Sequence, residues 1–202
     1  MDSTFAPADR LTARQRQLVD DLVDLFLSEG FAQLTLDDLA ARLGCSKRTL
    51  YALAESKEQL AVRAVRYFFK RATEQVEAAI ARTRSPAAKV TRYLEAVAEA
   101  LRPAGPQFRR DLARNAATHE VYEQNTLAAA ARVRELIDDG IKNGAFRNVS
   151  AGFVGEVVTA TMRRITSGEI GRSTGLDDAQ AYAELAKLVV AAIRRRPALI
   201  SG

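Results

Sequence analysis

The sequence is poor in the residues that crosslink small proteins or bind metals, with one cysteine, Cys45, and one histidine, His119, among 202 residues. A lone cysteine excludes an intramolecular disulfide, and these two residues alone cannot make a zinc site. No apolar stretch approaches the roughly 18 to 20 residues of a membrane span, and residues 1–9 lack the apolar core of a secretory signal. We therefore expect a cytoplasmic protein with no membrane partner, metal or cofactor.

The sequence also lacks the usual signs of an enzyme. Its only histidine and only cysteine lie 74 positions apart, and no glycine-rich phosphate loop follows a strand. We therefore expect no catalytic residues. Carboxylates alone can still perform acid–base chemistry, so an enzyme remains an open alternative.

The positive charge of +5 is unevenly distributed along the chain. Residues 1–60 contain seven Lys/Arg against ten Asp/Glu, whereas residues 61–202 contain 23 against 15. The net charge of the first 60 residues therefore cannot attract a nucleic acid. A local patch can, and residues 42–57 carry four cations against Glu55 alone: Arg42, Lys47, Arg48 and Lys57.

Apolar residues recur at helical spacing throughout, which predicts an all-α protein. Cap signals such as Thr12 with Gln15, Thr35 with Asp38 and Ser85 before Pro86 mark helix starts. Residues 167–176 contain three glycines and are predicted to be a mobile loop. About nine helices are expected, at 12–29, 35–43, 46–52, 56–83, 85–101, 107–118, 121–143, 150–166 and 177–196.

Residues 35–52 have the pattern of a helix-turn-helix. Leucines on one face of each short helix can pack the pair together, and Gly44 can adopt the left-handed turn conformation. The second helix begins with small polar and basic residues, where exposed N–H groups favour phosphate. Arg48 can read guanine bidentately, and Lys47 suits the DNA backbone.

From about Gly30 to Leu60 the sequence resembles the TetR family of bacterial transcriptional regulators. The matching residues read Gly-Phe-x-x-Leu-Thr-Leu-x-x-Leu-Ala-x-x-Leu-Gly-Cys-Ser-Lys-Arg-Thr-Leu-Tyr, followed by Ser-Lys-Glu-x-Leu. The resemblance implies an N-terminal three-helix DNA-binding domain at 1–55 and a ligand-binding and dimerisation domain at 56–202. It implies DNA contacts by Thr35, Ser46, Lys47, Arg48, Thr49, Tyr51 and Lys57. One departure bears on the reach of Lys57: Ala54 and Glu55 stand where the family usually has an aromatic residue and commonly a proline.

The resemblance further implies an inducer cavity among the later helices. Its expected lining is Phe68, Phe69, Tyr93, Phe108, Leu112, Asn115, His119 and Tyr122. A mostly apolar pocket with few polar anchors is the usual chemistry of such a site. Taken singly, each aromatic residue is more often part of the core.

Two helices near the C-terminus predict a homodimer. The helix at 150–166 is apolar over a wide arc and contains Gly152 and Gly155, which let another helix approach closely. The last helix offers Leu185, Leu188, Val189, Ala192 and Ile193. Two such helices per subunit make a four-helix interface across a two-fold axis, with the reading helices about 34–36 Å apart on a palindromic operator.

The function expected from these features is a ligand-responsive transcriptional regulator that binds a double-stranded DNA operator. The simplest version is a repressor released by a small-molecule inducer. An activator, or a helical ligand-sensing module without DNA binding, remains the alternative.

Overall fold

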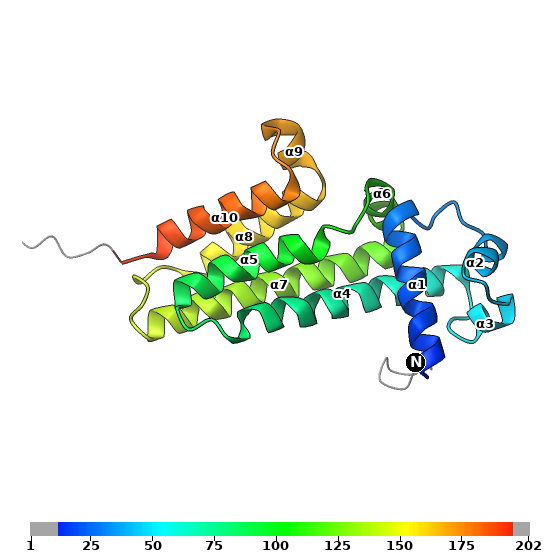
Figure 1. Ribbon diagram of the computed structural model, residues 1–202. Helices are drawn as coiled ribbons and strands as arrows, with labels where there is room; N and C mark the ends of the chain where they lie inside the picture. Colours follow the sequence, from blue (N-terminus) through cyan, green and yellow to red (C-terminus); the bar gives the residue numbers. More distant parts are fainter. Residues whose placement is uncertain (1–11, 196–202) are drawn as a thin grey trace, which may run out of the picture. The chain divides into compact units, whose positions relative to one another are not determined.

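The structure is a computed structural model that describes residues 12–195. The secondary-structure elements formed by these residues are all α-helices (Figure 1). The expectation of an all-α fold is thus confirmed. The helices are α1 (Ala13–Glu29), α2 (Leu36–Arg42), α3 (Lys47–Tyr51), α4 (Lys57–Ala81), α5 (Pro86–Leu101), α6 (Pro106–Arg114), α7 (Ala116–Lys142), α8 (Ala151–Thr166), α9 (Glu169–Thr174) and α10 (Asp178–Ile193).

The helices of the first half begin where the cap signals predict. Thr12 and Thr35 each form a reciprocal capping box, with Gln15 and Asp38 respectively. The side chain of Ser46 accepts a hydrogen bond from the Thr49 amide, and Ser85 caps α5 ahead of Pro86. These starts are predictable because each cap involves residues only three positions apart.

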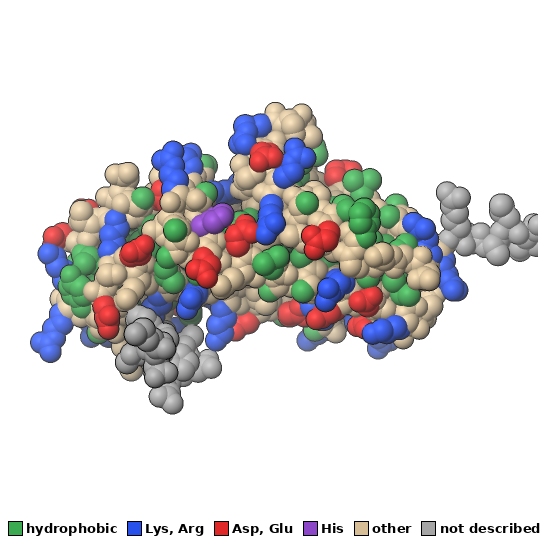
Figure 2. Space-filling view, turned by 180° about the vertical axis from the view of Figure 1, so that it is seen from behind, with side chains coloured by type: hydrophobic (Ala, Val, Ile, Leu, Met, Phe, Trp, Pro, Cys, Tyr) green, Lys and Arg blue, Asp and Glu red, His purple; other side chains and the backbone are tan. Residues whose placement is uncertain are grey.

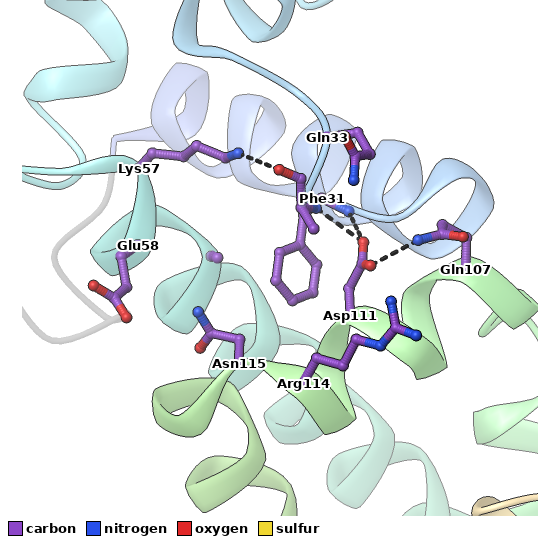
Figure 3. Close-up of a pocket in the computed structure, with 10 residues that line it drawn as sticks. Phe31, Gln33, Lys57, Glu58, Gln107, Asp111, Arg114 and Asn115 are labelled. Carbon is purple, nitrogen blue, oxygen red and sulfur yellow. Dashed lines mark hydrogen bonds between the residues drawn. The ribbon is translucent and has the colours of Figure 1, made fainter.

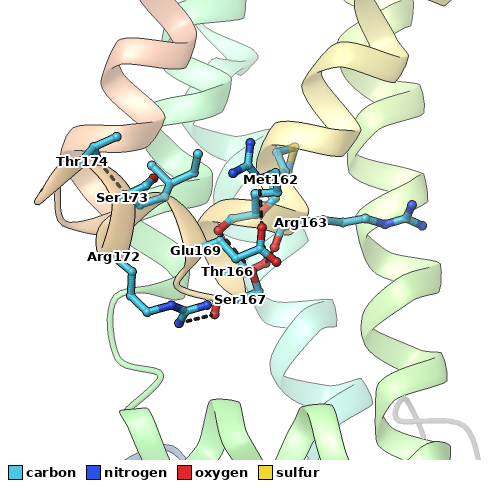
Figure 4. Close-up of polar contacts among 10 residues, drawn as sticks. Met162, Arg163, Thr166, Ser167, Glu169, Arg172, Ser173 and Thr174 are labelled. Atoms are coloured by element: carbon cyan, nitrogen blue, oxygen red, sulfur yellow. Dashed lines mark hydrogen bonds and ion pairs between the residues drawn. The ribbon is translucent and has the colours of Figure 1, made fainter.

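The described region contains ten helices, one more than expected, because α9 occupies the segment predicted to be a loop. Gly168 and Gly175 flank this short helix, and both adopt left-handed backbone conformations, with φ of 73° and 75°. Figure 4 shows the polar contacts around it, including the 3.3 Å hydrogen bond from the Arg172 guanidinium to the Ser167 carbonyl. Gly168 and Gly175 therefore mark the two ends of a short helix, in a segment that was predicted to be a loop.

The border between α6 and α7 also differs from the prediction. The sixth helix ends at Arg114 rather than near Thr118, and α7 begins at Ala116 rather than near Val121. Asn115 separates them with an extended backbone, and its side-chain oxygen accepts a 3.0 Å hydrogen bond from the Thr118 amide. The break between α6 and α7 therefore consists of a single residue, Asn115, which caps the start of α7. The last helix ends at Ile193, earlier than predicted; Arg196 lies outside the described residues.

The chain divides into two compact units. The head unit comprises residues up to Arg71 together with Pro103–Gln124, and so contains α1–α3, the start of α4, α6 and the start of α7. Its buried core includes Leu22, Phe26, Leu39, Leu50 and Phe108. The predicted division into 1–55 and 56–202 stays a prediction.

The body unit comprises Ala72–Arg102 and the residues from Asn125 on. In it α10 packs against α5 and α8 (Figure 1), around a core that includes Leu94, Ile137, Val158 and Ile193. A Cβ on Gly155 would lie 3.6 Å from the Arg134 Cβ of α7. Gly155 is therefore a contact within the chain rather than a place for a partner helix, whereas Gly152 has open space around it.

Candidate nucleic-acid interface and head cavity

Helices α2 and α3 form a helix-turn-helix around two buried leucines. Leu39 of α2 and Leu50 of α3 are almost fully buried, which fixes the inner face of each helix. Gly44 adopts φ of 58° in the turn, and the Cys45 amide donates a 3.0 Å hydrogen bond back to the Ala40 carbonyl. The opposite face of α3 is left at the surface.

That surface contains five of the residues predicted to contact DNA. Ser46, Lys47, Arg48 and Tyr51 are exposed and Thr49 is half-buried. Ser46 caps α3, and its hydroxyl lies 2.9 Å from the hydroxyl of Thr49. Tyr51 remains 51% exposed despite its size. We call these five residues the reading face.

Lys47 of the reading face is held by a carboxylate that the sequence prediction missed. Its Nζ lies 2.6 Å from Asp37 Oδ1 in the first turn of α2. This hydrogen bond, with the charge of Asp37, raises the pKa of Lys47. Arg48, in contrast, forms no ion pair with any carboxylate of the described chain. Of the two cations of the reading face, Arg48 is therefore the one that no carboxylate of the described residues holds.

Thr35 is engaged in the cap of α2. Its hydroxyl donates to Asp38 Oδ2 at 2.7 Å and accepts from the Asp38 amide at 3.1 Å. Hydrogen bonds from the Thr35 amide and hydroxyl lower the pKa of Asp38. A phosphate contact by Thr35 requires its hydroxyl to turn away from this carboxylate.

Lys57 reaches back toward the turn that follows α1. Its Nζ donates a 2.7 Å hydrogen bond to the Ala32 carbonyl, as Figure 3 shows. The junction between α3 and α4 that carries it is closed: Ala54 is buried, and Arg63 donates to the Leu53 carbonyl at 2.8 Å. The junction is therefore packed despite the small residue at position 54, and the hydrogen bond to Ala32 is what positions the Lys57 amine.

Most of the residues predicted to line an inducer cavity pack against one another in the head unit. Ring contacts join Phe108 to Phe68, Phe68 to Phe69, and Phe69 to Tyr122, with centroids 5.1–6.0 Å apart. Leu112 is buried, and Thr118 contacts Asn115. The His119 ring lies 6.2 Å from Tyr122 and is exposed; Figure 2 shows it at the surface.

Tyr93 is the member of this set that belongs to the body unit. Its hydroxyl donates to the Ala129 carbonyl at 3.3 Å. Burial raises the pKa of Tyr93 strongly, so the phenol stays protonated. The eight predicted residues thus divide between the two units, and their role in binding an inducer stays a prediction.

A cavity of about 460 Å³ opens in the head unit (Figure 3). We call it the head cavity. It lies beside the turn after α1, the first residues of α4, and the junction of α6 with α7. Its lining is Phe31, Ala32, Gln33, Lys57, Glu58, Ala61, Gln107, Asp111, Arg114 and Asn115. Asn115 is the member of the predicted inducer set that lines it.

Asp111 of α6 fixes one wall of the head cavity. The residue is 3% exposed, and its carboxylate Oδ2 accepts hydrogen bonds from the amides of Phe31 at 2.7 Å and Ala32 at 2.9 Å. The other oxygen accepts from the Gln107 side chain at 2.7 Å. Sequence reasoning missed Asp111, although a charged residue between Phe108 and Leu112 on an apolar face was a usable signal.

Residues 18–64 match the family model of bacterial regulatory proteins of the tetR family. No curated protein matches the chain. The match covers α2 and α3 entirely, and with them the reading face.

Solved structures share the fold over nearly the whole chain. A protein from Saccharomonospora viridis, described as a transcriptional regulator in complex with choline, is 17% identical with a TM-score of 0.73, over 91% of this chain and 98% of that one. A TetR regulator from Chloroflexus aurantiacus is 23% identical with a TM-score of 0.72, over 90% and 96%. A structure concerned with control of antibiotic production by a bacterial hormone is 21% identical with a TM-score of 0.73, over 92% and 100%.

Among residues 12–195, none of the helices combines the length and the hydrophobicity that a membrane-spanning segment needs. In the same residues no three His, Cys, Asp or Glu side chains gather to hold a metal ion.

Proposed function

The chain carries the N-terminal DNA-binding domain of the tetR family of bacterial regulatory proteins, and from this premise we propose that it is a homodimeric, ligand-responsive repressor of transcription. The observation that carries the proposal is the reading face, which keeps four polar or cationic side chains and a tyrosine at the surface of a helix-turn-helix. An activator uses the same DNA contacts, so the direction of regulation is part of the proposal.

In the proposed complex, α3 enters the major groove of the operator. Arg48 donates two hydrogen bonds to a guanine, and Ser46 and Thr49 contact neighbouring base edges. Lys47, Thr35, Tyr51 and Lys57 contact phosphates and set the register. Lys47 must exchange Asp37 for a phosphate, which is an exchange of one charge-assisted hydrogen bond for another.

The dimer is proposed to form through α8 and α10. Phe153 and Val157 of α8 are 69% and 45% exposed, and Leu188 of α10 is 68% exposed. Large apolar side chains exposed together on packed helices are typical of an interface. A two-fold axis through such a face gives two reading faces, and hence a palindromic operator.

Release by an inducer is proposed to follow from a shift between two conformations. The proposed inducer site in the head unit comprises Phe68, Phe69, Phe108, Leu112, Asn115, His119 and Tyr122. Ring contacts that join five of them, Phe68, Phe69, Phe108, His119 and Tyr122, support the proposal. Tyr93 belongs to the body unit, and its part in inducer binding stays a prediction. An inducer must bind the conformation that does not fit DNA more tightly than the one that does, because equal affinity shifts nothing.

The test is DNA binding by the purified protein, measured by fluorescence anisotropy. Duplexes from upstream of its own coding region are titrated over a salt series, with random duplexes as reference. We expect fragment-selective affinity that falls steeply as salt rises, since several phosphates are neutralised.

A double variant, Lys47→Ala with Arg48→Ala, tests the reading face. We expect it to lose selective binding while keeping the helical content and oligomeric state of the parent. Arg66→Ala, an exposed cation of α4 outside the reading face, is the matched control and should bind as the parent does. Selective binding retained by the double variant overturns the assignment, and no binding to any duplex by the parent favours a ligand sensor without DNA.

A further inference from the structure

We propose that the head cavity is a binding site for a small molecule that carries one phosphate or carboxylate group on a compact apolar body. The inference rests on the proposed function for its consequence on DNA binding, and on geometry alone for the binding itself. The volume of the head cavity, about 460 Å³, lies within the range of small-molecule pockets, roughly 300 to 1,000 Å³.

The lining of the head cavity combines apolar side chains, which can contact the apolar part of a ligand, with side-chain amides. Phe31 presents its ring in the middle of the view in Figure 3 and is buried, as is Ala61. Three side-chain amides, those of Gln33, Gln107 and Asn115, also line the cavity. An apolar wall beside a few polar groups is the arrangement that holds and orients a small ligand.

Two cations and two carboxylates line the cavity, but their availability differs. Neither Lys57 nor Arg114 forms an ion pair with a carboxylate of the described residues; Lys57 donates to a neutral carbonyl. The carboxylate of Asp111, in contrast, accepts three hydrogen bonds and is buried. Glu58 and Arg114 are both exposed, whereas Lys57 is half-buried, so water screens the charges of Glu58 and Arg114 more than that of Lys57. The two cationic donors that no carboxylate already holds are Lys57 and Arg114, and such donors select an anion.

Lys57 links this site to DNA. It is one of the proposed phosphate contacts, and the same amine donates into the turn that borders the cavity. One ammonium cannot serve a cavity anion and an operator phosphate with full strength at once. Anion binding in the head cavity is therefore expected to weaken operator binding, and by linkage the operator weakens anion binding equally.

Binding is tested first without DNA, on the full-length protein, with phenyl phosphate as the probe. Calorimetric titrations compare it with benzoate and with benzamide, which has the same ring and no charge. We expect saturable binding of one or both anions, one per chain, and none of benzamide. The two anions distinguish a phosphate ligand from a carboxylate ligand.

Arg114→Gln identifies the site, because Arg114 belongs to the cavity and not to the reading face. We expect its dissociation constant for the anion to rise about tenfold, the effect of losing one charge-assisted hydrogen bond. Arg66→Gln removes an equal charge from α4 outside the cavity and should bind the anion as the parent does. Equal loss in both variants, or no saturable binding by the parent, overturns the proposal.

The operator titration is then repeated with and without the anion. We expect phenyl phosphate to weaken operator binding by the parent, and to need about tenfold higher concentrations for the same effect on Arg114→Gln. Operator binding by Arg114→Gln without anion tests the proposed function separately, since it should equal that of the parent. Anion binding with no effect on operator affinity refutes the link through Lys57, and failure of all DNA binding refutes the proposed function alone.

Discussion

At the residue scale, the contact between Asp37 and Lys47 bears on the proposed DNA contacts, and we expect Asp37 to oppose them. It lies in the first turn of α2, where a carboxylate favours the positive end of the helix, and it holds Lys47 of the reading face at 2.6 Å. A phosphate that approaches Lys47 must displace this carboxylate and meets its negative charge. In the protein without DNA, Lys47 is thus less available to a phosphate than its exposure alone indicates.

Replacing Asp37 by asparagine should strengthen operator binding, roughly threefold at low salt, because it frees Lys47 and removes one negative charge near the backbone. The salt dependence of the affinity should become steeper. Anisotropy titrations over a salt series measure both effects. Asp24→Asn, which removes an exposed charge from α1 away from the reading face, is the control. Unchanged affinity in Asp37→Asn would show that Lys47 makes no phosphate contact.

Residue positions were predictable where the partners are close in sequence. The exposed set on α3 follows from the spacing of Leu39, Gly44 and Leu50, which places Ser46 to Thr49 on the outer side. The partners of Asp111 lie 80 and 79 positions away, so no local pattern identifies them. The same holds for Lys57 and Ala32, which are 25 positions apart.

At the scale of elements, the C-terminus of α1 and the N-terminus of α6 approach backbone to backbone. The Gly105 amide donates a 2.8 Å hydrogen bond to the Leu27 carbonyl, and a Cβ on Gly105 would lie 2.7 Å from that oxygen. Gly30, at the C-terminal end of α1, lies against the side chains of Asp111 and Gln107 of α6. Two glycines therefore allow α6 to hold the turn that leads into α2.

Gly30→Ala should destabilise the head unit by more than about 2 kcal/mol. Its backbone, with φ of 81° and ψ of −175°, lies in a region open essentially to glycine alone, which costs a residue with a Cβ about 1–3 kcal/mol. The added Cβ would also lie 2.5 Å from both Asp111 Oδ2 and Gln107 Cγ. Gly44 has a positive φ of 58° as well, but open space around it, so Gly44→Ala should cost only about 1 kcal/mol. Urea unfolding of both variants measures the difference. Equal losses would mean that the approach of α6 adds nothing.

The boundaries of a helix were predictable where residues close to them in sequence determine where the helix begins. The starts of α1, α2, α3 and α5 depend on caps that can be read within four residues. The break between α6 and α7 was predicted at residues 119–120 rather than at Asn115, because the helical spacing of apolar residues continues across Asn115. The short helix α9 was missed because glycines at 168 and 175 suit either a loop or the two ends of a helix.

At the scale of the whole molecule, operator binding depends on the proposed dimer. A single reading face contacts one half-site, whereas two joined faces bind the second half-site at a high effective concentration. The exposed Phe153, Val157 and Leu188 are the side chains available to bury between two subunits. Burial of large apolar side chains contributes about 1.5–3 kcal/mol each, so one charge placed among them should separate the subunits.

Leu188→Glu should therefore convert the protein from a dimer to a monomer of 22.1 kDa, as sedimentation equilibrium measures directly. Operator affinity should fall at least about a hundredfold, because the gain from joining two half-sites is lost, while the reading face stays intact. Leu127→Glu on α7 is the control, since Leu127 is 53% exposed and lies outside the proposed interface. A Leu188→Glu variant that remains dimeric places the interface elsewhere. A monomer with full affinity for the operator removes the need for two reading faces, and with it the expectation of a palindrome.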